Sequence, residues 1–344
     1  RRFDVLREWR QLVSKTRSRH RIGALVVVAP GLLGLPDDAL ARSTTLARLA
    51  GLATSPPVIE PRGIEAATVA AVGYGGAPTP LAALGAGLDP ADQWVMHADP
   101  LQIEVGATDV VVAARVDDLD ADDAHALAAD ISELIAYTGV RIAIARPDRW
   151  FALSAGDFAV DALPVEAIIG HGLRGELRRD DGARVLARMR GEIEMLLHEH
   201  RVNRARRNRG AATVDSLWLW GGGRMSAAPD ELEACSADAH PGRSGDLARG
   251  LAIASGGRIV APGDRDESPA ATVVVTDPLG SEADLDAFGR GTLATALTRL
   301  QARRIDELVL VADSSGRAAT WHARAPGAIR RLGLLVGGAR FVRP

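Results

Sequence analysis

Two kinds of apolar pattern alternate along the chain. Uninterrupted apolar runs of about four to eight residues predict strands buried on both faces, whereas apolar residues spaced three and four positions apart predict helices with one buried face. The strand pattern covers 22–29, 216–220, 271–275 and 307–312. The helical pattern covers 37–53, 181–200, 247–255 and 285–301. Because strands and helices alternate at both ends of the chain, the sequence predicts an α/β fold with a mostly parallel sheet flanked by helices.

A different pattern interrupts this alternation in the middle of the chain. Residues 93–116 alternate between apolar and polar like paired strands, and 140–145 with 150–153 read as a second pair. Between them, a helix is expected to begin at Asp120 and to end before Gly139. The middle region therefore reads as an inserted α+β domain. The predicted division is an N-terminal helical arm at 1–21, a discontinuous core domain at 22–92 and 205–344, and an inserted domain at 93–204.

The bulk composition is that of a globular protein with a full core. Of the 344 residues, 47% are hydrophobic and 25% are charged, and no apolar run approaches the ~20 residues of a membrane span. The single cysteine, Cys235, excludes an internal disulfide framework and indicates a reducing compartment. We therefore expect a cytoplasmic protein with no membrane partner. The chain begins with Arg1 and not with Met, so the true start is expected to be missing.

The charges nearly balance, but they are clustered. A net charge of −3, from 41 basic and 44 acidic residues, argues against a dedicated nucleic-acid binder. The acidic run 117–123 is interpreted as the capping of a helix start and not as a metal site. An arginine-rich run at 201–209 complements a helix end or, alternatively, binds an anion.

The stretch Ser216–Gly223 is the most distinctive segment of the sequence. Trp218 and Trp220 are two residues apart on a strand, so both indoles point to one face and the intervening leucine points to the other. Gly221, Gly222 and Gly223 then permit close approach of another backbone or of a ligand. Two interpretations remain open: the indoles line a pocket, or they fill a core that is poor in aromatic residues.

Several polar residues stand at the predicted ends of helices and strands. His198 and His200 point in divergent directions on a helix, so a shared metal ion is not expected. His97 and Asp99 could form an acid–base pair, although a surface polar pair is the commoner arrangement at a strand end. Asp313 follows the last buried strand, at the edge of the sheet where ligands bind in such folds.

A family resemblance is carried by His198–Asn203, Arg206, Gly210 and Val214–Gly223. Together these residues resemble the signature of the RpfE-type regulatory proteins of proteobacteria. Those proteins are similar to archaeal-type cofactor-independent phosphoglycerate mutases, which belong to the alkaline phosphatase superfamily. Weaker matches follow in order along the chain at 81–85, 88–90, 94–99, 146–150 and 246–251. The resemblance implies an alkaline-phosphatase-like sheet and a role in controlling extracellular enzymes or virulence factors.

The catalytic residues that the resemblance implies are mostly absent. Ala29, Pro30 and Gly31 stand where the mutases carry a metal-binding Asp, and Gly76 stands at the position of the nucleophilic Ser or Thr. Near the last strand Asp313 is kept, but Ser314 replaces the expected His. Two-metal phosphoryl transfer requires several carboxylate and His ligands together with a nucleophile. The hydroxyls that could replace the nucleophile are those of Thr79, Ser43, Thr44 and Thr45.

We therefore expect a degenerate phosphomutase-like protein that has a regulatory or ligand-binding role and needs no cofactor. The alternative is an active phosphoglycerate mutase or phosphohydrolase with a rearranged site that uses Mn²⁺ or Mg²⁺. The expected partner is a small anionic or phosphorylated ligand, or another protein. The predicted ligand-binding residues are His198, His200, Asn203, Arg206, Trp218, Trp220, Gly221, Gly222, Gly223 and Asp313.

Overall fold

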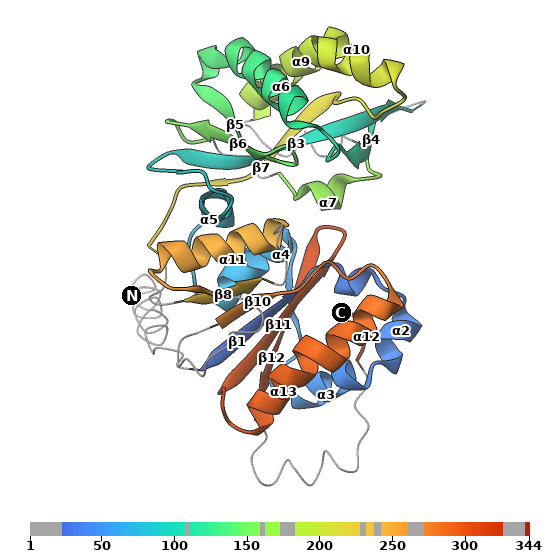
Figure 1. Ribbon diagram of the computed structural model, residues 1–344, viewed down its shortest axis with the longest axis vertical. Coiled ribbons are helices and arrows are strands. Elements are labelled where there is room, and N and C mark those ends of the chain that lie inside the picture. Colours follow the sequence, from blue (N-terminus) through green and yellow to red (C-terminus); the bar gives the residue numbers. More distant parts are fainter. Residues whose placement is uncertain are drawn as a thin grey trace, which may run out of the picture.

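The chain forms two units, each built around one sheet and stacked along the long axis of the molecule (Figure 1). The computed structural model describes residues 23–106, 110–158, 162–172, 183–227, 232–236, 242–260, 272–325 and 341–344. We call the described residues of 94–223 the inserted unit and the described residues of 23–86 and 232–344 the core unit. The arm predicted at 1–21 lies outside the described residues.

The core unit contains a seven-stranded sheet with the order β2-β12-β11-β1-β10-β8-β9. Its strands are β1 (Ala24–Ala29), β2 (Val58–Glu60), β8 (Glu233–Ser236), β9 (Ile259–Val260), β10 (Thr272–Val275), β11 (Glu307–Ser314) and β12 (Arg317–Arg324). β1 runs parallel to β10 and β11, and only β12 and β2 are antiparallel. The predicted α/β architecture with a mostly parallel sheet is confirmed.

Helices cover both faces of the core sheet (Figure 1). One face packs against α2 (Asp37–Arg42), α3 (Thr44–Leu52), α12 (Glu282–Phe288) and α13 (Ala294–Gln301). The other face packs against α4 (Gly63–Ala71) and α11 (Arg243–Ala254). Successive residues of β1 point to opposite faces, and all of them are buried. This two-sided burial explains why the strand has no polar position.

Two predicted helices of the core unit are interrupted. The helix expected over 37–53 is divided into α2 and α3, because the Ser43 side chain accepts a hydrogen bond from the backbone N–H of Leu46 and starts a new helix. The helix expected over 285–301 begins earlier, at Glu282, and contains a π-helical turn at Gly289–Leu293.

The inserted unit contains a five-stranded sheet covered on one face by helices (Figure 1). Its strands are β3 (Trp94–Val105), β4 (Val110–Arg115), β5 (Val140–Arg146), β6 (Arg149–Ser154) and β7 (Ser216–Gly223), and its helices are α6 (Ala121–Leu134), α7 (Val165–Ile168), α9 (Ala183–Glu199) and α10 (Arg201–Asn208). As predicted, the side chain of Asp120 caps α6 by accepting from the N–H of Asp123. The predicted pairing of β5 with β6 is also observed.

The position of β7 differs from the sequence expectation. The segment after residue 204 was expected in the core domain, but β7 pairs antiparallel with β3 in the sheet of the inserted unit. Its apolar residues on both faces suit either sheet, so the pattern could not distinguish them. Trp218 and Trp220 share one face, and Leu217 and Leu219 share the other, as expected from strand alternation.

Two connectors join the units. Helix α5 (Pro78–Gly85) lies between the two units (Figure 1). The connectors follow α5 at 86–93 and β7 at 224–231, of which 224–227 are described. No helix within the described ranges is long and apolar enough to span a bilayer.

Candidate functional site at the junction of the two units

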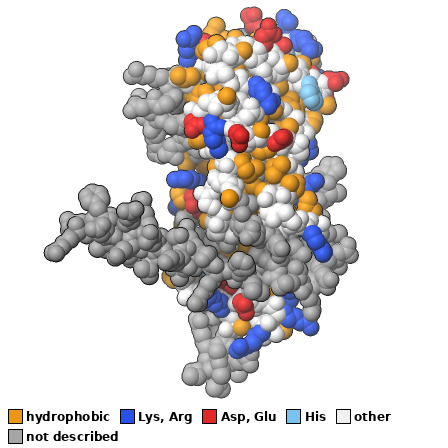
Figure 2. Space-filling model, turned by 90° about the vertical axis from the view of Figure 1, so that its left-hand side faces the viewer, with side chains coloured by type: hydrophobic (Ala, Val, Ile, Leu, Met, Phe, Trp, Pro, Cys, Tyr) orange, Lys and Arg blue, Asp and Glu red, His pale blue; other side chains and the backbone are white. Residues whose placement is uncertain are grey.

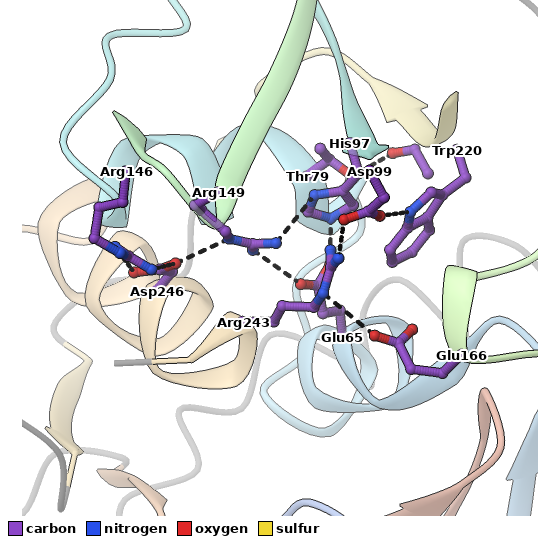
Figure 3. A network of polar contacts seen from close by, with 11 residues as sticks. Glu65, Thr79, His97, Asp99, Arg146, Arg149, Glu166, Trp220, Arg243 and Asp246 are labelled. Carbon is purple, nitrogen blue, oxygen red and sulfur yellow. Dashed lines mark hydrogen bonds and ion pairs between the residues drawn. The ribbon is translucent and has the colours of Figure 1, made fainter. Parts of the chain in front are cut away.

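Buried charged side chains from both units meet at the junction between them (Figure 3). The core unit contributes them from α4 and α11, which are held in place by close packing of α5 against α11. Gly85 and Gly250 make that packing possible, because a Cβ on either residue would collide with the backbone of the other helix. The inserted unit contributes charged side chains from β3, β5, β6 and α7.

Glu65 of α4 contacts two residues of the inserted unit. Its Oε2 lies 2.7 Å from Nε2 of His97, and its Oε1 lies 3.4 Å from Nη2 of Arg149. Nη1 of Arg149 lies 3.5 Å from Nδ1 of His97. Because the guanidinium can only donate, we assign the imidazole proton to Nε2, which donates to Glu65.

Asp246 of α11 binds two arginines at once. Arg146 forms a fork with it, from Nη1 to Oδ1 at 3.0 Å and from Nη2 to Oδ2 at 2.9 Å. Nε of Arg149 also donates to Oδ2, at 3.0 Å. Both Arg149 and Asp246 are almost inaccessible to water. Such paired geometry is what a buried carboxylate requires, because an unpaired buried charge is strongly destabilising.

Arg243, the first residue of α11, holds the other end of the network. It forms an ion pair with Asp99 of β3, and its Nε lies 3.2 Å from Oε1 of Glu166 in α7. The second oxygen of Asp99 accepts from the indole N–H of Trp220 at 2.6 Å. The Arg243 guanidinium also lies over the Trp220 ring, with its Cζ 5.4 Å from the ring centroid, which is within reach of a cation–π interaction.

The pKa shifts follow from burial and from these partners. Burial would raise the pKa of Glu65, but His97 and Arg149 lower it to about 2. For Asp99, burial is likewise outweighed by Arg243, and its pKa is lowered. Burial lowers the pKa of His97 despite the neighbouring Glu65. At neutral pH Glu65 and Asp99 are therefore ionised, and the imidazole of His97 is neutral.

The carboxyl ends of β1 and β11 form a second polar region, next to the junction. Oδ1 of Asp313 accepts from the backbone N–H of Gly31 at 2.7 Å. Burial, and to a smaller extent the nearby Glu166, raise the pKa of Asp313 to about 6 against the opposing effect of the Gly31 N–H. A partly buried carboxyl with a raised pKa is a feature that active sites share.

Helix α7 packs directly on the core unit beside this region. A Cβ on Gly316, in the turn between β11 and β12, would collide with Ala167. A Cβ on Gly63, at the start of α4, would lie 3.0 Å from Cγ of Pro164. The contact of α7 with these two glycines brings Glu166 close to both Arg243 and Asp313.

The described residues do not form the two-metal centre that the resemblance implies. Among them, no three His, Cys, Asp or Glu side chains are placed to hold a metal ion. The hydroxyl of Thr79 is fully buried and donates to the carbonyl of Gly221, and Ser43 caps α3. These hydrogen bonds give both hydroxyls a backbone partner, whereas a nucleophile is activated by an adjacent base.

Four of the predicted ligand-binding residues lie in the helix layer of the inserted unit, on the side away from the junction. His198 is exposed, and His200 contacts Asp130 through Nε2 at 2.8 Å. Asn203 is buried and donates to the carbonyls of Leu197 and Val214. Arg206 is also buried; it donates to the carbonyl of Ala212 and pairs with Asp118. The last three side chains thus hold α10 against its neighbours.

The residues predicted from the Trp-Gly motif lie nearer the junction. Trp218 donates from its indole N–H to the carbonyl of Leu163, and Trp220 donates to Asp99. The three glycines pack against neighbouring side chains: a Cβ on Gly221 would lie 2.8 Å from Oγ1 of Thr79, one on Gly222 would lie 2.5 Å from Nε1 of Trp94, and one on Gly223 would collide with Ala77. Close intramolecular packing accounts for all three. The structure therefore separates the predicted residues into this group, the helix-layer group and Asp313.

Sequence reasoning missed several members of the network. His97 and Asp99 were expected at a surface, but both are buried, because they lie on the part of β3 that meets Glu65 of α4 and Arg243 of α11. Glu65, Arg243 and Asp246 were not predicted at all. Asp246 stands on the apolar face of its helix, beside Leu247 and Gly250, and this unusual position was the available signal.

Comparisons with known proteins point to one class of enzyme. No protein-family model matches the sequence. A 2,3-bisphosphoglycerate-independent phosphoglycerate mutase from Methanothrix thermoacetophila is 31% identical over 97 residues, which are 28% of this chain and 25% of that protein. Over this region the chain is similar to the cofactor-independent phosphoglycerate mutases. The similarity thus spans about a quarter of the length of that mutase.

Two solved structures resemble the chain more distantly. The PH0037 protein from Pyrococcus horikoshii has 14% sequence identity and a TM-score of 0.44, with 89% of this chain and 88% of that chain covered. The cofactor-independent phosphoglycerate mutase from Thermoplasma acidophilum has 18% identity and a TM-score of 0.39, with 88% and 89% covered.

Proposed function

We propose that this chain is a phosphoglycerate-mutase-like protein that lacks phosphotransfer activity and acts by binding, in a regulatory role of the RpfE type. The observation that supports it most directly is the chemistry at the carboxyl ends of β1 and β11. Pro30, Gly31 and Asp313 stand there, and the described residues offer no set of three metal-binding side chains. A two-metal phosphoryl transfer needs more ligands than this, and a nucleophile as well.

The balance of charge at the junction bears on the kind of partner. Three arginines face four carboxylates there, and each arginine is already paired with at least one of them. A small anionic ligand would have to displace a carboxylate of the chain itself. We therefore favour a protein partner over a small anionic ligand, with cytoplasmic action and no cofactor as parts of the same proposal.

Nucleic acid is a less suitable partner. On the face shown in Figure 2, acidic and basic side chains are interspersed and do not form a continuous basic surface. The arginine cluster at 201–209 is partly neutralised as well, because Arg206 pairs with Asp118 and Arg209 pairs with Asp123. Nucleic-acid binding depends on many unpaired basic groups.

The alternative function is a metal-dependent phosphoglycerate mutase or phosphohydrolase with a rearranged site that uses Mn²⁺ or Mg²⁺. The partly buried Asp313, whose pKa is raised and whose hydrogen-bond donor is the backbone N–H of Gly31, is the feature that favours it. A bound cation would neutralise this carboxylate.

An activity assay separates the two functions. We expect no turnover when the full chain is incubated with 3-phosphoglycerate and Mn²⁺ or Mg²⁺. Turnover that disappears in Asp313→Ala but persists in the matched surface variant Asp286→Ala would contradict the binding role. Asp286 suits the control because it lies exposed on α12, in an ion pair with Arg290.

A further inference from the structure

Six ion pairs of the junction network join one unit to the other. Glu65, Arg243 and Asp246 belong to the core unit, and their partners belong to the inserted unit. The pairs are Glu65–His97, Glu65–Arg149, Asp246–Arg146, Asp246–Arg149, Arg243–Asp99 and Arg243–Glu166. A further pair, Arg146–Asp148, lies within the inserted unit. Figure 3 shows the six pairs as two neighbouring groups, one around Arg149 and Asp246 and one around Arg243. The network therefore fixes how the two units sit against each other.

The connectors lie at one side of this junction, and α7 lies at the other (Figure 1). Around the connectors the contacts are apolar: Leu88 and Met225 pack with a cluster that includes Leu81 of α5 and Phe151 of β6. Arg224 ties the connectors together, because it donates to the carbonyl of Asp92 and, at 2.7 Å, to Oδ1 of Asp157. The side with the connectors thus has the features of a hinge.

The charges of the buried side chains in the network balance one another. Arg149 has an exposed side-chain fraction of 2%, and it lies between Glu65 at 4% and Asp246 at 0%. The carboxylates in excess of the arginines are the exposed ones: Glu166 is 40% exposed, and Asp148, which pairs with Arg146, is 45% exposed. A buried charge that loses its partner remains uncompensated unless water reaches it. Separating the units would provide that water.

We propose that the junction is a charge latch, in which the apolar cluster at the connectors is the hinge and the ion pairs keep the two units closed only while each buried charge has its partner. Arg149 is the central element, because it alone contacts both Glu65 and Asp246. Removing it leaves Glu65 with a neutral imidazole, and hydration of that carboxylate then favours the open arrangement. The latch does not depend on whether the chain has enzymatic activity.

Hydrogen–deuterium exchange of the full chain tests the latch. In Arg149→Met we expect amides of β3, β6 and the first turns of α11 to exchange about ten-fold faster than in the wild type, while α9, α12 and α13 are unchanged. The added substitution Glu65→Gln should restore most of the protection, because it removes the uncompensated charge and keeps an acceptor for His97. Glu192→Gln, which breaks the exposed pair with Arg188, is the control and should change nothing at the junction.

Three results would overturn the proposal. The first is wild-type exchange at the junction in Arg149→Met, and the second is an equal increase in both units, which indicates general destabilisation. The third is a double variant that exchanges as fast as Arg149→Met. If Arg149→Met does not fold, Arg243→Met decides at the far side, because it leaves the buried Asp99 without its cation. Faster exchange confined to β3, α7 and the start of α11 supports the latch, and unchanged exchange there refutes it.

Discussion

Asp246 is buried and Asp313 is partly buried near the same junction, but the surroundings of the two carboxylates are opposite. Asp246 accepts from two arginines, whereas Asp313 accepts from one backbone N–H and lies near another carboxylate, Glu166. The carboxylate at the junction therefore has cationic partners, whereas Asp313, at the carboxyl end of the core sheet, has a backbone N–H as its partner. The contrast shows that burial by itself does not determine whether a carboxylate stabilises the fold; its partners do.

The largest expected effect comes from removing the arginine that pairs with a buried carboxylate of the junction. Arg243→Met removes the cation from Asp99, which is buried, and leaves it only the indole N–H of Trp220. Loss of one partner of a buried pair should lower the free energy of unfolding by about 3–5 kcal/mol at pH 7.5. Urea denaturation measures this loss. Arg290→Met, which breaks an exposed pair on the surface of the core unit, should cost less than about 0.5 kcal/mol.

Removing the negative charge of Asp313, at the carboxyl end of the core sheet, should stabilise the protein. The pKa of Asp313 is about 6 when folded and close to 3.8 when unfolded, so the folded state binds the proton more tightly. The stability from Asp313 is therefore present at low pH and is lost as the pH rises from about 4 to 6. Asp313→Asn keeps an acceptor for Gly31 and should raise the free energy of unfolding at pH 7.5 by on the order of 2 kcal/mol.

Urea denaturation at two pH values tests whether Asp313→Asn raises or lowers the free energy of unfolding. The gain from Asp313→Asn should be clearly smaller at pH 5 than at pH 7.5, because the wild-type carboxyl is mostly protonated at the lower value. A variant that is less stable than the wild type at pH 7.5 would show that the ionised carboxylate is compensated by a cation.

The smallest expected effect compares the two indoles. Trp220→Phe removes a donor from the charged Asp99, whereas Trp218→Phe removes a donor from the neutral carbonyl of Leu163. Hydrogen bonds to charged groups contribute about 1.5–3 kcal/mol, and those to neutral groups about 1 kcal/mol. Thermal unfolding should therefore rank Trp220→Phe as the more destabilising change. Equal losses would mean that Arg243 alone satisfies Asp99.

Much of the fold could be predicted because it depends on local patterns. The buried strand β1, the capped helix α6 and the hairpin of β5 and β6 all carry periodicity or capping signals within a few residues. The division of 37–53 into two helices depended on one side chain, that of Ser43, whose hydroxyl competes for the backbone. That competition is also local, but the apolar spacing over 37–53 predicted one continuous helix.

The candidate site was predicted less completely. The Trp-Gly motif could be read directly, as could the position of Asp313 at a strand end. The partners could not, because Arg146 and Asp246 are separated by 100 positions. Residues such as Glu65 have no neighbouring signal that reveals which arginine will face them.

The sequence by itself determined the types of element, the α/β class and which residues, such as Pro30, Gly31 and Asp313, stand at the ends of β1 and β11, because these follow from residue identity and short-range spacing. Only the tertiary structure decided that β7 joins the inserted sheet and that three arginines and four carboxylates meet at one junction. The physical reason is that strand pairing and charge neutralisation join residues far apart in the chain. Their energies depend on burial, and burial exists only once both units have folded.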